Sequence, residues 1–191
     1  NLIQFNDADT NSGNITVQRN SKMKRLDYTY WGSPVSGQKL RSFSPATLNT
    51  RFYVYNEAND YFDGIFVKNT YPTDGLYPTP TPSLTPVQPE ASYDFEKAKG
   101  YAVRSPNNFT TSVSDFMGNF VGKPNNGVFT ININKSANTV IGGNTYKHGI
   151  NLISNPYPSN IDLDKFFAAN PSLEKVARFW TNINPNPAMQ G

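Results

Sequence analysis

The apolar residues of this chain recur at every second position, in short runs separated by asparagine, glycine and proline. Such alternation is typical of β-strands with one buried face, because successive side chains of a strand point to opposite sides. Asn and Gly tolerate positive φ angles and Pro presets turns, so the separating residues suit tight connections. We expect strands over residues 14–19, 25–31, 51–56, 65–68, 100–104, 119–121, 128–134, 139–141, 145–146, 149–153 and 177–181. This spacing predicts a mostly β chain, folded as an antiparallel β-sandwich of jelly-roll-like type with one short helix near the C-terminal end.

The dipeptide Asn126-Gly127 is the strongest local turn signal in the chain. Asn-Gly suits turn positions that need φ above zero, and alternating apolar residues lie on both sides of it. We therefore expect a hairpin that joins residues 119–121 to residues 128–134.

One helix is expected, over residues 161–169. Ser159 with Asp162 three residues later resembles a capping box, and Asn170-Pro171 ends the helical pattern. Leu163, Phe166 and Phe167 form an apolar stripe at helical spacing, so we expect this helix to pack over the end of a sheet.

Residues 71–90 differ from the rest because six prolines lie there among threonine and serine. Proline cannot donate to a regular ladder, so this stretch should run extended, as a surface loop or as a linker between two domains. We favour the loop, because neither half holds enough strands for an independent core. The chain is then a single module over 1–191, and its ends suggest a piece of a longer polypeptide, whose remainder would be its first partner.

Composition excludes several classes of protein. The absence of cysteine rules out disulfides and thiolate metal sites, and a single histidine rules out a multi-histidine metal centre. The net charge is only +3, from 17 Lys and Arg against 14 Asp and Glu, without the clustering that a nucleic-acid partner requires. No apolar run approaches the ~20 residues of a membrane helix, so we expect no membrane insertion.

The most metal-like stretch is Asp7, Asp9 and Asn11, whose side-chain oxygens alternate along the chain. Ca²⁺ binds six to eight oxygens, which makes this stretch a weak calcium candidate. It fails as an EF-hand loop, because Gly13 comes one position late and Gln18 stands where the bidentate Glu belongs. A solvated turn is the simpler interpretation, with no cofactor.

Catalytic signatures are weak. His148 is the only imidazole, no Gly-x-Ser-x-Gly elbow occurs, and no spacing identifies a facing pair of carboxylates. We expect no catalytic residues and no enzymatic activity.

Aromatic residues make up 14% of the chain and are dense in its first third. Rings flanked by amides suit sugars, because a ring covers apolar C–H groups while amides bond hydroxyls. The alternative is that about half of these rings fill the core. The candidates for glycan binding are Tyr28, Tyr30, Trp31, Tyr53 and Tyr55.

Several segments form an ordered set that is more specific than any single motif. They are residues 14–19, 27–35, 43–45, 51–53, 100–106, 120–127, 151–159, 161–162 and 179–180. Together they resemble a recurring β-rich region of large exported cell-surface proteins of Bacteroidetes, especially flavobacteria, which are type IX secretion substrates. The resemblance implies a secreted or cell-surface location and carries no catalytic residues.

Two functions are therefore expected from different classes. The first is a non-catalytic module of a secreted or cell-surface bacterial protein, serving adhesion or surface presentation with a surface protein as its partner. The second is a carbohydrate-binding accessory module of a secreted polysaccharide-degrading enzyme, with a glycan as its ligand. Exposed, coplanar rings beside Asn or Asp would favour the second, and burial of Trp31 with Tyr28 and Tyr30 would weaken it.

Overall fold

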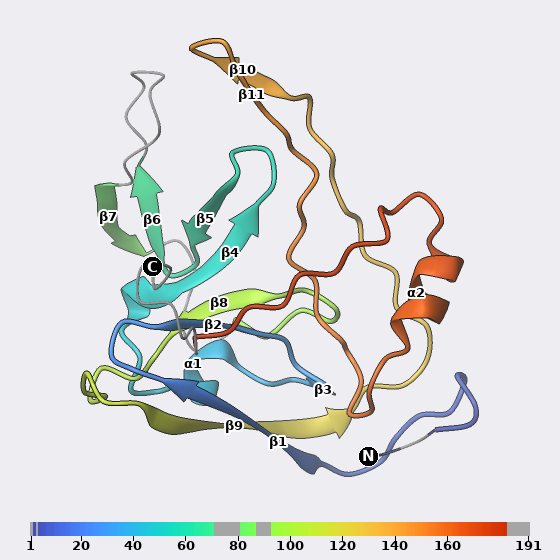
Figure 1. Ribbon diagram of the computed structural model, residues 1–191. Helices are drawn as coiled ribbons and strands as arrows, with labels where there is room; N and C mark the ends of the chain where they lie inside the picture. The colour runs from blue at the N-terminus through green and yellow to red at the C-terminus, as the bar shows by residue number, and fades with distance from the viewer. Residues whose placement is uncertain (1, 3, 71–80, 87–92, 183–191) are drawn as a thin grey trace.

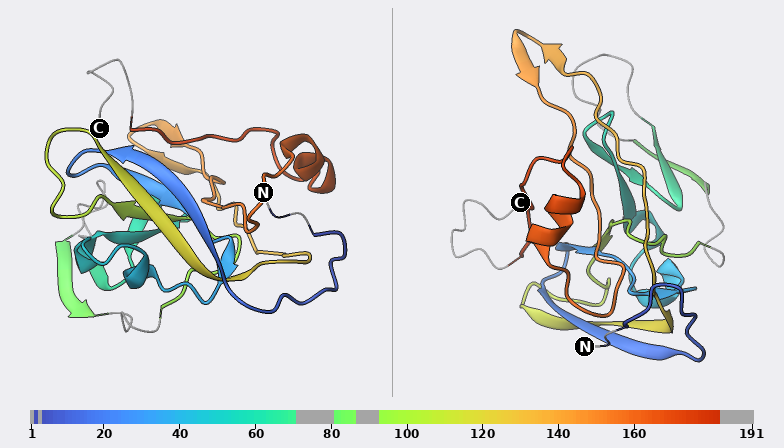
Figure 2. Two further views of the ribbon diagram at one scale, coloured as in Figure 1. Left: turned by 90° about the horizontal axis from the view of Figure 1, so that it is seen from below. Right: turned by 90° about the vertical axis from the view of Figure 1, so that its right-hand side faces the viewer.

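The computed structural model describes residues 2, 4–70, 81–86 and 93–182. Its strands pair antiparallel, and its two larger sheets face each other across a shared core (Figure 1 and Figure 2). This confirms the predicted mostly β, sandwich-like class with a short helix toward the C-terminal end. No helix in the described ranges is long and apolar enough to cross a membrane. The elements are β1 (Ile15–Met23), β2 (Tyr28–Trp31), β3 (Val35–Ser36), α1 (Leu40–Phe43), the 3-10 turn η1 (Asn49–Arg51), β4 (Phe52–Asn56), β5 (Tyr61–Gly64), β6 (Val67–Thr70), β7 (Thr81–Pro86), β8 (Tyr101–Arg104), β9 (Ser114–Pro124), β10 (Thr139–Ile141), β11 (Asn144–Tyr146) and α2 (Leu163–Ala169).

The first sheet has the order β1-β9-β3 and is built on the long strand β9. β1 runs antiparallel to β9 with Ile15 opposite Gly122, and β3 pairs with the last residues of β9. Burial alternates along β9, as the period-2 pattern predicts. Phe120 is buried toward the second sheet, while Met117 and Val121 are exposed on the outer face.

The second sheet has the order β2-β8-β4-β5. Its inner face is set by register, because Trp31 lies opposite Tyr101 and Phe52 lies opposite Val103. All four of these side chains are buried. The alternate residues of the same strands therefore form the outer face.

Phe43 of α1 lies at the centre of the aromatic core between the sheets. Its ring stacks on Phe120 with centroids 4.5 Å apart and meets Trp31 at 5.1 Å and Phe95 at 5.4 Å, both edge-on. Such edge-to-face contacts add to area burial, so large rings replace the many aliphatic residues of an ordinary core.

Strands from both sides of the Pro-rich segment share the two larger sheets. β1 pairs with β9 in the first, and β4 pairs with β8 in the second. Residues 81–86 of the segment form β7, which pairs with β6, whereas 71–80 and 87–92 lie outside the described residues. This arrangement favours the loop over a linker between domains.

The hairpin expected at Asn126-Gly127 is wrong. Gly127 does take a positive φ of 89°, but residues 128–134 form no strand. β3 pairs with Lys123 and Pro124, the positions beside the turn at which a returning strand would begin to pair. The Asn126 side chain instead donates to the carbonyl oxygens of Asn6 and Asp9, at 2.7 and 2.9 Å.

Residues 128–153 instead form an arm, in which two extended legs lead to and from the β10-β11 hairpin (Figure 1 and Figure 2). The expected strands at 139–141 and 145–146 are thus present and pair with each other. The expected strands at 149–153 and 177–181 are absent, apart from one isolated bridge between Ile153 and Lys99.

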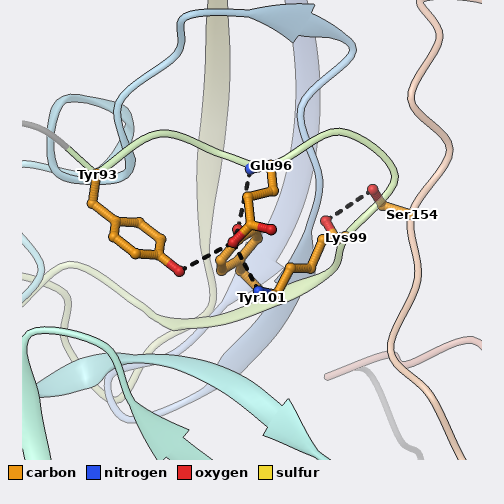
Figure 3. A network of polar contacts seen from close by, with 5 residues as sticks. All are labelled: Tyr93, Glu96, Lys99, Tyr101 and Ser154. Atoms are coloured by element: carbon orange, nitrogen blue, oxygen red, sulfur yellow. Dashed lines mark hydrogen bonds and ion pairs between the residues drawn. The ribbon is translucent and has the colours of Figure 1, made fainter. Parts of the chain in front are cut away.

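A polar network joins the residue that follows the returning leg of the arm, Ser154, to the segment that leads into β8. Figure 3 shows the Lys99 ammonium donating to the Glu96 carboxylate at 2.8 Å, with the hydroxyls of Tyr93 and Tyr101 donating to the same oxygen. The Ser154 hydroxyl donates to the Lys99 carbonyl oxygen at 3.0 Å. Burial raises the pKa of Tyr101, so its hydroxyl stays protonated within this network.

Helix α2 is shorter than expected and is capped differently. It begins at Leu163, and the Asp162 carboxylate, not Ser159, accepts from the Lys165 amide at 3.1 Å. None of its residues is buried, so the expected packing over a sheet end is also wrong. Its two Phe rings pack mainly against each other, with centroids 5.4 Å apart.

Candidate functional site: an aromatic face of the second sheet

The outer face of the second sheet is lined by aromatic side chains. Because strand residues alternate between faces, burial of Trp31 and Phe52 places their neighbours on the opposite side. We call the resulting set the aromatic face; its members are Tyr28, Tyr30, Tyr53, Tyr55, Phe62 and Trp180.

The rings of the aromatic face form two groups, and the rings within each group are in contact. Tyr30 lies between Phe62 and Trp180, with centroids 5.7 and 5.6 Å away and planes inclined by 32° and 35°. Tyr55 meets Phe62 edge-on at 5.2 Å. Tyr28 and Tyr53 form the second pair, at 5.8 Å.

The smallest side chain of this face lies at its centre. Ala102 of β8 is opposite Tyr30 on one side and Tyr53 on the other. Arg104 follows on the same face, opposite Tyr28, and is almost fully buried. The burial lowers the pKa of Arg104 by desolvation.

The phenol groups are held by polar neighbours at the rim. Tyr53 donates to the Thr50 carbonyl oxygen at 2.9 Å and accepts from Arg51 at 3.1 Å, a bond that raises the Arg51 pKa. Tyr55 donates to the Asp60 carboxylate. Burial, and then this carboxylate, raises the Tyr55 pKa, and burial also raises that of Tyr30. The phenols of Tyr30 and Tyr55 are therefore neutral at ordinary pH.

Trp180 reaches this face from a distant part of the sequence. Its indole N–H donates to the Tyr28 carbonyl oxygen at 2.8 Å, while 52% of the residue stays exposed. Beside it lies an open pocket of about 380 Å³, lined by Trp180 itself and by Asn20, Ser21, Lys22, Thr29, Thr181 and Asn182.

The structure brings together four of the five residues proposed for glycan binding. Tyr28, Tyr30, Tyr53 and Tyr55 share the aromatic face. Trp31 is only 6% exposed and lies in the core, so it offers no ring to a ligand.

Two members of the aromatic face, Phe62 and Trp180, were not among the residues predicted for glycan binding. Phe62 could have been found from the register of a β4-β5 hairpin, since Tyr55 lies directly opposite it. For Trp180, no local pattern signals a contact with β2.

A family comparison adds to these observations. A family model described as a domain of unknown function (DUF8693) matches residues 1–190. The chain belongs to this family. No curated protein and no solved structure matches it. Because the description of DUF8693 names no activity, the chemistry must be argued from the residues themselves.

In this DUF8693 chain, two side-chain oxygens of the Asp7 to Asn11 loop accept hydrogen bonds from amide side chains that precede the loop. The Asn11 side-chain oxygen accepts from Gln4 at 2.7 Å, and an Asp9 carboxylate oxygen accepts from Asn6 at 2.8 Å. Within the described ranges, no three His, Asp or Glu side chains gather where they could hold a metal ion. The geometry favours the solvated-turn interpretation over the calcium site.

His148 packs the arm against the β4-β5 turn. Its Nε2 lies 2.9 Å from the Thr139 hydroxyl, and its Nδ1 lies 3.2 Å from the Glu57 carbonyl oxygen. The Glu57 carboxylate in turn accepts from the amide and the hydroxyl of Ser136. Both ring nitrogens thus have structural neighbours.

The aromatic face is therefore suited to contact rather than to proton transfer. Its rings offer apolar surface, and the phenol and amide groups at its rim are of the kind that bond polar ligand atoms. It supports binding to a broad surface or to the face of a small polar ring.

Proposed function

We propose that this DUF8693 chain is a non-catalytic module of a secreted or cell-surface bacterial protein, acting in adhesion or surface presentation. The observation that carries the proposal is the aromatic face, with Arg51 beside Tyr53. Tyr, Trp and Arg are the residue types enriched at protein interfaces and at their energetic hot spots. The resemblance to exported Bacteroidetes proteins supplies the location.

Adhesion is tested by coating beads with the purified chain and measuring their retention on cells and on protein-coated surfaces under flow. The variants Tyr30→Ala and Tyr55→Ala should lower retention by about tenfold, because each removes a central or rim ring of a contact surface. The matched controls are Met117→Ala and Val121→Ala, which remove exposed apolar side chains from the outer face of the other sheet.

The control variants Met117→Ala and Val121→Ala should retain binding, and thermal melts should show that every variant is folded. Equal retention of wild type and the tyrosine variants would reject the aromatic face as the contact surface. A wild-type chain that is retained on no cell or protein surface would reject adhesion itself.

A second candidate function is carbohydrate binding as an accessory module of a polysaccharide-degrading enzyme. It is favoured by the pocket beside Trp180, where an exposed indole adjoins the amides of Asn20 and Asn182. A ring next to amide groups is the arrangement that stacks on a sugar and bonds its hydroxyls.

Glycan binding is tested on a glycan array with wild type, Trp180→Ala, Tyr55→Ala and the control Met117→Ala. Loss of a specific signal in the first two variants alone would support this candidate. Binding of no glycan by the wild type would reject it. Trp31→Ala is unsuitable here, because Trp31 belongs to the core.

A further inference from the structure

The outward leg of the arm has the side-chain pattern of a strand without the pairing of one. Apolar and polar residues alternate from Phe129 to Ile133, yet no strand forms there. Val128 is 80% exposed and Ile133 is 41% exposed. A period-2 segment left open in this way is a template for another strand.

The backbone of this leg is unpaired between two anchored ends. Between Thr130 and Ile133, no backbone N–H or C=O group has a hydrogen-bond partner among the described residues. At one end, the Tyr157 hydroxyl donates to the Gly127 carbonyl oxygen at 2.6 Å. At the other, the Asn151 side chain accepts from the Asn134 N–H at 3.1 Å and donates to its C=O at 2.8 Å.

The Asn151 amide thus occupies the place that a partner strand would take at Asn134. It offers one acceptor and one donor, as a peptide unit does. Its contact ends at Asn134, so between the two anchors four residues, Thr130–Ile133, have backbone donors and acceptors without a partner in the part of the chain that the structure describes.

Lysines lie at and beyond the ends of the open leg. The Lys97 ammonium lies 4.8 Å from the centroid of the Phe129 ring. Lys135 follows Asn134 in the outward leg, and Lys147 is the first residue of the returning leg. None of these three lysines has a carboxylate partner among the described residues.

We propose that residues 128–133 are an acceptor edge for β-strand addition, and that the partner is an extended acidic peptide segment of another polypeptide. Backbone hydrogen bonds to Thr130–Ile133 would provide the binding energy, and the alternating apolar side chains would set the register. Carboxylates at the ends of the incoming strand would pair with the lysines. A second copy of this chain fits less well, because pairing two open legs would bring lysine toward lysine.

The probe is a synthetic peptide in which Val and Thr alternate between Glu residues at both ends. Its binding is measured by titration calorimetry, and hydrogen exchange of the chain locates the contact. We expect amide exchange to slow at Thr130–Ile133 by about tenfold or more at saturation, and the affinity to fall with added salt. Matched peptides with a central Pro, or with Lys in place of Glu, should bind at least about tenfold more weakly.

Variants of the chain separate the two contributions. Ile131→Pro removes one free donor, and Lys135→Glu reverses one charge; both should weaken the peptide, whereas the remote control Lys175→Glu should not. Ile131, Lys135 and Lys175 lie outside the core, and thermal melts check that the three variants fold. Tyr30→Ala should leave peptide binding unchanged, so failure of the adhesion proposal and failure of this one are distinguishable.

Two results would overturn the proposal. One is a peptide that neither binds nor slows exchange at 130–133. The other is exchange already slowed without peptide in a concentration-dependent dimer, which would assign the edge to a second copy of the chain.

Discussion

Phe43 is the residue on which the two sheets converge. Its ring contacts rings of β2 and β9 and the ring of Phe95, and the residue is 5% exposed. Phe43→Ala should lower the free energy of unfolding by about 3–5 kcal/mol, because the cavity left among rigid rings collapses poorly. Urea denaturation measures the loss. Phe179→Ala, at a residue 81% exposed, is the control and should leave the midpoint nearly unchanged.

The loop of Asp7, Asp9 and Asn11 gives a second prediction at the residue scale. Two of its oxygens already accept from Gln4 and Asn6, so calcium would have to displace existing hydrogen bonds. We expect millimolar calcium and a chelator to give the same Tm. A ligand that binds only the folded state must raise Tm in proportion to its occupancy, so a clear rise that Asp9→Asn abolishes would restore the calcium site.

At the element scale, the arm is attached to the β4-β5 turn through a carboxylate. The amide and hydroxyl of Ser136 donate to Glu57 at 2.9 and 2.7 Å, and these bonds lower the Glu57 pKa. Because the carboxyl pKa is lower in the folded state, the carboxylate stabilises the attachment fully at pH values above the unfolded pKa. This stabilisation is lost as the pH falls through the folded pKa. We therefore expect the arm to loosen below the ordinary titration range of glutamate.

Amide exchange at Ser136, corrected for the intrinsic effect of pH, measures this loosening. Wild type should lose protection on acidification, whereas Glu57→Gln should start with less protection and vary little with pH. The control Glu174→Gln, on an exposed glutamate, should behave as wild type. Wild-type protection that is constant down to pH 3 would contradict the role of the carboxylate.

Alternation of apolar and polar residues shows which segments can form strands, but it does not show which segments pair. It located β4 and β8 well, because both strands lie in the middle of a sheet and their pattern matches their pairing. The same alternation failed at residues 128–134, since hydrogen-bond partners are a tertiary property. It also left Tyr30 and Trp31 undecided, because both faces of β2 are aromatic, and only packing shows which one is buried.

At the scale of the whole molecule, one cooperative unit is expected. Strands from before and after the Pro-rich segment pair in both larger sheets, so neither part keeps a complete sheet without the other. Circular dichroism and tryptophan fluorescence should give coincident unfolding transitions. Trp180→Phe leaves Trp31 as the sole tryptophan, so the tryptophan signal then reports the core alone. Two separated transitions would indicate two domains divided by that segment.

The pairing of β1 with β9 also sets the order of events in folding. Gln18 bonds across the pair to Asn119, a residue 101 positions later in the sequence. The first strand of the chain therefore has no partner in its sheet until β9 is available. Closing so long a loop costs entropy before any contact repays it, and folding rates fall as contact order rises. We expect this sandwich to assemble slowly, with β1 among the last strands to be secured.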